Sequence, residues 1–213
     1  CVVGSEMCIR DSVNIGDYKN VWDELIRDIP QMRELATEHF DNWKDTKAFA
    51  TKALSASQIN NSDVVTDNNR DDNSKNITAD NSSEDTSDNI TGIHGFYHKN
   101  IFEAVYCTNL LMRSADVLVT KPSELAFYPV PKLFIKRVGG HEQWGAVHSA
   151  EIGDGTLECR DIPHTLQMIK LFMEDDTYII DMCKNIKKNK QMGIYNGAYE
   201  AVKLAVNMKK SDI

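Results

Sequence analysis

Short apolar runs alternate with helix-like stretches along most of this chain, and this alternation limits the folds that are open to it. The clearest run is Val117-Leu118-Val119, which is typical of a strand buried inside a parallel sheet. Strands are expected at residues 13–16, 90–97, 116–120, 132–138 and 157–159. Helices are expected at residues 21–29, 32–54, 101–114, 123–128, 142–152 and 198–208, with two more between 162 and 186. The alternation predicts an α/β fold, a parallel sheet with flanking helices and right-handed crossovers.

Residues 57–89 interrupt this pattern. They hold eight Asn, seven Asp, one Glu, six Ser and three Thr, and their only basic residues are Arg70 and Lys75. A segment this polar cannot bury enough apolar surface to offset the entropy lost on ordering. We therefore expect a disordered Asn/Asp/Ser-rich insertion in a surface loop. Residues 13–56 and 90–213 are then the two parts of the α/β fold.

The first twelve residues, CVVGSEMCIRDS, have neither the basic start nor the apolar stretch of a secretory signal. They closely resemble the translated sequence of an adapter used in making sequencing libraries. We therefore expect residues 1–12 to be an artefact and the natural chain to be truncated upstream of Val13.

Composition excludes two classes of protein. No apolar run approaches the ~18 residues that a membrane-spanning helix needs, which leaves only peripheral membrane association open. The net charge is −8, whereas a nucleic-acid-binding protein needs a basic face. Of that charge, −6 belongs to residues 57–89, so the rest is close to neutral.

Beyond residue 12 the chain has three cysteines, Cys107, Cys159 and Cys183, which are widely spaced and form no C-x-x-C motif. This pattern favours a reducing cytoplasm over a disulfide framework. His94 and His98 flank strand sequence, where residues four apart are too distant to share one metal ion. We expect no metal site.

In an open α/β sheet, ligands bind beyond the carboxyl ends of the strands, so loops that follow strands are the candidate sites. The first loop is residues 120–124, where Lys121 and Ser123 combine a positive charge, a hydroxyl and a helix start into a candidate anion site. The alternative is a plain proline turn with a serine cap. The second loop is residues 139–146, where a glycine pair allows close approach of a ligand. The alternative there is an ordinary glycine turn. A third candidate, residues 153–156, is weaker.

Two segments carry a resemblance to a known family. They are NLLMRSADVLVTKPSE (109–124) and PKLFIKRVGGHEQWGA (131–146). Both resemble the nucleotide-sugar-binding C-terminal lobe of GT-B glycosyltransferases of the MurG and monogalactosyldiacylglycerol synthase group, glycosyltransferase family 28. Residues 115–121 match the family's A-D-L-V-I-T-[RK] strand, and His141, Glu142 and Ala146 have the spacing of its H-Q-x-x-N-A motif. Pro122-Ser123 replaces a glycine-rich turn, and Glu142 replaces a glutamine.

The resemblance implies a Rossmann-like lobe that binds a nucleoside-diphosphate sugar, such as a UDP-sugar, without a metal ion or another cofactor. The protein would be a hexosyltransferase whose acceptor and catalytic base belong to a missing N-terminal lobe, so the fragment would be inactive alone. Its catalytic residues and its acceptor are unknown. The expected donor-binding residues are Lys121, Ser123, Glu124, Gly140, His141, Glu142 and Gln143.

Two alternatives stay open. A sugar-nucleotide epimerase with the GT-B fold would use the same lobe, with more acid and base residues in its cleft. A non-catalytic nucleotide-sugar-binding domain would fit the replaced glycine turn.

Overall fold

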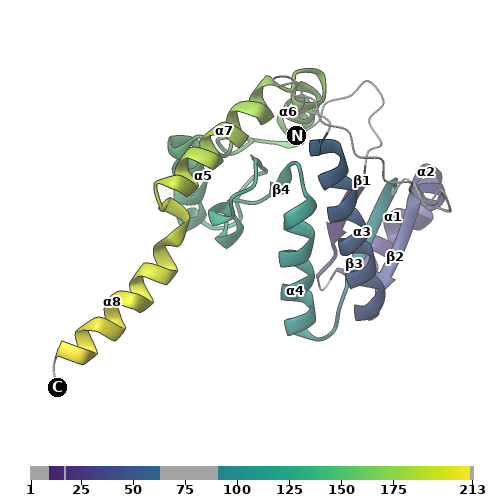
Figure 1. Cartoon of the computed structure of the whole chain (residues 1–213). Helices are drawn as coiled ribbons and strands as arrows, with labels where there is room; N and C mark the ends of the chain where they lie inside the picture. The colour runs from purple at the N-terminus through teal and green to yellow at the C-terminus, as the bar shows by residue number, and fades with distance from the viewer. Residues whose placement is uncertain (1–9, 17, 63–90, 212–213) are drawn as a thin grey trace, which may run out of the picture. The chain divides into compact units, whose positions relative to one another are not determined.

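The computed structural model describes residues 10–16, 18–62 and 91–211, and it divides the chain into two compact units (Figure 1). The first unit ends at Ser114 and the second begins at Ala115. Each unit is described by itself below. Within the described residues, no helix combines the length and the apolar character needed to cross a membrane.

The first unit has a three-stranded parallel sheet. Its strands are β1 (Arg10–Asn14), β2 (Ala36–Phe40) and β3 (Gly92–Tyr97), in the order β1-β3-β2. The chain passes from β1 to β2 through α1 (Lys19–Asp28) and α2 (Pro30–Leu35), and returns to β3 through α3 (Trp43–Ser62). Because these two crossovers run in opposite directions, the right-handed rule predicts helices on opposite faces.

Neighbouring residues of β3 confirm this arrangement, because successive side chains of a strand point to opposite faces. Gly95 faces α1, since a Cβ atom placed there would lie 2.7 Å from Cζ2 of Trp22. Phe96 faces α3, and its ring centroid lies 5.2 Å from that of Phe49. Helix α4 (Ile101–Leu111) lies beside α3 on that face (Figure 1), and its Cys107 joins the buried cluster of Phe49, Ala53 and Phe96.

The second unit is built on two short parallel strands, β4 (Leu118–Thr120) and β5 (Lys132–Phe134). On the other side of β5, residues 155–159 run parallel to it, with a bridge between Lys132 and Gly155 and a hydrogen bond from Cys159 N–H to the Phe134 carbonyl. The remaining elements are η2 (Glu124–Phe127), η3 (Gly140–Glu142), α5 (Gln143–Ile152), α6 (Ile162–Glu174), α7 (Thr177–Gln191), η4 (Ile194–Asn196) and α8 (Gly197–Ser211).

Leu133 and Phe134 place cores on both faces of this small sheet. Leu133 packs with Cys159, Phe172 and Met182, so α6 and α7 cover one face. Phe134 packs with Ala126 and Ala146 on the other face, against η2 and α5. Helix α8 differs from its neighbours, since every residue from 197 to 208 is exposed.

The predicted α/β class and the parallel strands agree with the structure. Instead of one sheet, the described residues form two, one in each unit. The helix expected at residues 32–54 is wrong in its middle, because residues 36–40 pair with β3 as strand β2. Long-range pairing overrides local helical spacing there.

Several expected boundaries also shift. The strand expected at 132–138 ends at Phe134. Residues 157–159 form no strand, and Cys159 N–H donates a hydrogen bond to the Phe134 carbonyl of β5. Helix α3 continues to Ser62, into the first part of the expected insertion, and residues 63–89 lie outside the described residues. Strand β1 begins at Arg10, within the expected adapter segment, of which residues 1–9 are not described.

The contact between β3 and α1 predicts a large cost for Gly95→Ala. The new methyl group would meet Trp22 at 2.7 Å and Cδ1 of Ile15 at 3.0 Å, so the variant should lose about 1–3 kcal/mol of unfolding free energy in urea. Gly197→Ala is the control, because no atom lies within 4 Å of a Cβ there. Equal stability of Gly95→Ala and the wild type would contradict this packing.

Candidate functional site

Three loops of the second unit leave the sheet at one edge. Because β4, β5 and residues 155–159 are parallel, their carboxyl ends lie together. Two hydrogen bonds connect these ends: Ile135 N–H donates to the Thr120 carbonyl, and Arg137 N–H donates to a carboxylate oxygen of Glu158. The loops that begin at Lys121, Arg137 and Arg160 therefore share this edge.

An ion pair joins the first two loops. Nζ of Lys121 lies 2.5 Å from Oε1 of Glu142, whose side chain is only 6% exposed, while that of Lys121 is 46% exposed. Oε2 of Glu142 accepts hydrogen bonds from the backbone N–H groups of Val138 (2.8 Å) and Gly139 (3.1 Å). We call these three donors, from Lys121, Val138 and Gly139, the anion cradle. The loops that the sequence predicted to converge do meet here.

The anion cradle changes the acidity of the carboxyl group that it binds. The hydrogen bond from Lys121, followed by those from Gly139 and Val138, lowers the pKa of Glu142 to about 2. Glu142 is therefore ionised throughout the physiological pH range. The cradle has the donors that suit a phosphate or a carboxylate, and the chain's own carboxylate occupies it.

The backbone of α5 at Gly145 packs closely against the loop after β4. A Cβ atom at Gly145 would lie 2.7 Å from the carbonyl oxygen of Pro122, so only glycine lets α5 pack this tightly against the loop after β4. The H-Q-x-x-N-A motif of the GT-B glycosyltransferases has an asparagine at this position, and its side chain would collide with that carbonyl oxygen.

The other predicted residues lie on the same two loops without joining the cradle. Ser123 is partly buried and its hydroxyl makes no capping hydrogen bond to η2, whose four residues are too few for a helix-terminus anion site. The remaining four are exposed at the surface: Glu124, Gly140, His141 and Gln143.

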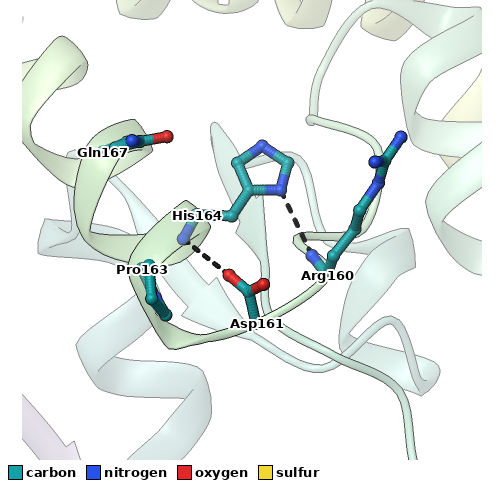
Figure 2. Close-up of a pocket in the computed structure, with 5 residues that line it drawn as sticks. All are labelled: Arg160, Asp161, Pro163, His164 and Gln167. Atoms are coloured by element: carbon teal, nitrogen blue, oxygen red, sulfur yellow. Dashed lines mark hydrogen bonds between the residues drawn. The ribbon is translucent and has the colours of Figure 1, made fainter.

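The third loop forms an open pocket of about 400 Å³ at the start of α6 (Figure 2). The lining residues are Arg160, Asp161, Pro163, His164 and Gln167. Asp161 caps the helix by accepting the His164 N–H at 2.9 Å, and Nδ1 of His164 accepts the Arg160 N–H at 3.2 Å. This pocket was not among the candidates predicted from sequence, although the expected strand at 157–159, followed by a helix, indicates its position.

Residues 153–156, the third candidate from sequence, lie at the opposite edge. Asp154 forms an ion pair with Lys132 at 2.7 Å, and both side chains are fully buried. The hydroxyl of Tyr195 donates a hydrogen bond to the same carboxylate. Burial lowers the pKa of Lys132, and the ion pair opposes this shift. This loop enters a strand instead of leaving one, so its role is structural.

Within the described ranges, no group of three or more His, Cys, Asp and Glu residues is arranged to hold a metal ion. His94 and His98, four residues apart, are both buried and bind different partners. His94 hydrogen-bonds to His39, and His98 to the hydroxyl of Thr46.

The lowered pKa of Glu142 predicts an acid-sensitive contribution to stability. Because the folded-state pKa lies near 2 and the ordinary value is 4.5, this contribution is complete above pH 4.5 and is lost as the pH falls toward 2. Glu142→Gln should remove it, whereas the exposed Glu174→Gln on α6 should retain it. Urea unfolding at pH 5, 4 and 3 measures the difference. Identical pH profiles for the two variants would contradict the assignment.

A family model matches this chain over residues 5–72 and 56–206, and its description is a domain of unknown function, DUF6938. No curated protein and no solved structure matches the chain. Since the two matched segments cover most of its length, the chain belongs to the DUF6938 family.

Proposed function

We propose that the second unit is a Rossmann-like lobe that binds a nucleoside-diphosphate sugar at the carboxyl edge of β4 and β5. One observation carries this proposal: Lys121 and Glu142, from loops that follow two adjacent parallel strands, meet in the anion cradle. Ligands of open α/β sheets bind at this edge. The resemblance to GT-B glycosyltransferases assigns the same two loops to the donor.

In this proposal the diphosphate replaces the carboxylate of Glu142 in the cradle. Lys121 and the N–H groups of Val138 and Gly139 then face the phosphate oxygens and offset the charge that builds on the departing nucleoside diphosphate. The released carboxylate is free to accept a hydrogen bond from a ribose or sugar hydroxyl.

The pocket at the start of α6 is our candidate for the uncharged part of the donor. It follows residues 155–159, the neighbours of β5, and so opens at the same edge as the cradle. The acceptor and the catalytic base would come from a second lobe.

A second candidate is binding without transfer, and the Lys121–Glu142 pair favours it. A lysine that already faces a carboxylate stabilises a leaving group less than a lysine whose charge no carboxylate offsets. A sugar-transfer assay on the protein with its second lobe separates the two functions, because only a transferase releases the nucleoside diphosphate.

We also place the protein in the cytoplasm. Cys107 and Cys159 are buried free thiols, and burial raises the pKa of each. Buried, unpaired thiols suit a reducing compartment.

Two substitutions test the proposal, one in the anion cradle and one at the carboxylate that occupies it. Lys121→Ala should weaken UDP binding about ten- to a hundredfold, because it removes a charge-assisted hydrogen bond worth roughly 1.5–3 kcal/mol. Glu142→Gln tests the carboxylate: UDP binding tightens if the carboxylate only competes with the diphosphate for the cradle, and it weakens if the released carboxylate holds a ribose hydroxyl. Calorimetric titration of UDP and UDP-sugars measures both.

Lys184→Ala is the matched control, because this lysine is 71% exposed and pairs with Asp181 on α7. It should bind UDP as the wild type does. A folded wild-type protein that binds no nucleoside diphosphate would refute the proposed function.

A further inference from the structure

Helix α8 has an apolar face that is exposed along its length. Figure 1 shows α8 extending from the end of α7, away from β4. Tyr199, Val202 and Val206 recur at the spacing of one helix face and are between 49% and 68% exposed. Glu200 and Lys203 belong to the opposite, polar face. Such an amphipathic helix ordinarily packs its apolar face against a core, whereas this face meets solvent.

The part of the chain that contains α8 is also strongly basic. Residues 184–210 hold seven lysines and one acidic residue, so their net charge is +6, whereas the whole chain has a net charge of −8. Lys187, Lys188 and Lys190, near the end of α7, are all exposed. Within the described residues, these three lysines form no ion pair, so no carboxylate there offsets their charge.

Buried contacts hold the basic end of α7 and the start of α8 on the second unit. Asn189, which stands among the three lysines in sequence, is buried and donates a hydrogen bond to the Ile152 carbonyl at 2.8 Å. Tyr195 belongs to η4, directly before α8, and its hydroxyl donates to the carboxylate of Asp154 at 2.8 Å. The lysines and the apolar helix are therefore anchored side by side along the chain.

The combination of an apolar face and uncompensated lysines selects one class of partner. A nucleic acid would use the lysines and leave the apolar side chains in water. A second copy of this chain would bring the same positive charges together, which opposes pairing. The surface of an anionic bilayer suits both features, because its interface accepts the apolar face of a helix and its headgroups attract lysines.

We propose that α8 and the basic end of α7 form a docking surface for a bilayer that contains anionic lipids. Helix α8 lies in the plane of the interface, with Tyr199, Val202 and Val206 at the boundary between headgroups and acyl chains. The lysines of α7 face the anionic headgroups. Because Tyr195 joins this surface to the amino edge of the sheet, it is separate from the anion cradle at the carboxyl edge. The proposal does not rest on the proposed function.

Cosedimentation of the full chain with lipid vesicles tests this surface. The chain should bind vesicles of phosphatidylserine and phosphatidylcholine in equal amounts, and it should bind pure phosphatidylcholine vesicles far less. Added salt should weaken binding, since it screens the attraction between lysines and headgroups. If the folded chain ignores the anionic vesicles, or binds both kinds equally, the proposal is overturned.

The contribution of the lysines is measured by Lys187→Gln, Lys188→Gln and Lys190→Gln. Each change should weaken binding to the anionic vesicles about fivefold, because each removes one cation near the surface. Lys170→Gln is the control, since this lysine is 73% exposed on α6, outside the docking surface. It should bind as the wild type does. Equal effects of the control and the three α7 variants would overturn the proposal.

Val202→Gln and Val206→Gln measure the contribution of the apolar face. Glutamine forms helices at least as well as valine, so weaker binding reports the lost apolar contact and not a lost helix. The double variant should bind the anionic vesicles about tenfold more weakly or less. Glu200→Gln, on the polar face of the same helix, should bind at least as tightly as the wild type.

Sedimentation velocity of the same variants without lipid distinguishes a bilayer from a second copy. The wild type and the double valine variant should sediment alike. A wild-type dimer that the valine changes dissociate would assign the apolar face to a second copy and overturn the proposal. Wild-type vesicle binding by the double variant would overturn it as well.

Discussion

Parallel pairing of β5, with β4 on one side and residues 155–159 on the other, determines where each polar group of the second unit lies. It brings three loops to the carboxyl edge and sends the loop with Asp154 to the amino edge. The anion cradle depends on this pairing, because Lys121 and Glu142 are 21 positions apart and share no element. In the first unit, β3 has the same role between β1 and β2.

The sequence predicted what depends on local chemistry. Proline and glycine marked the turns around the cradle, and the first helix expected after residue 162 agrees with α6, which Asp161 caps. Strand β2 was missed because its five residues stand between two helices and become extended only through pairing with β3. That error hid His39, which reaches His94 only when both residues lie on adjacent strands.

The sequence predicted the position of the candidate site but not the contacts within it. The order of strands and loops indicated that Lys121 and Glu142 would converge, but a sequence does not tell that one neutralises the other. Glu142 was expected to bind the donor, and within the chain it binds two backbone N–H groups and a lysine. The pocket beside Arg160 was missed because the loop that enters residues 157–159 was chosen instead of the loop that leaves them.

The two lysine–carboxylate pairs at opposite ends of β4 and β5 differ in access to solvent. Lys132 and Asp154 are fully buried, whereas the side chain of Lys121 is almost half exposed. A lysine-acylating reagent therefore has a route to Lys121 and none to Lys132 in the folded unit. Any molecule that occupies the cradle would shield Lys121 from the reagent. The chemical reactivity of one lysine thus reports occupancy of the site, and the other serves as a reference built into the same sheet.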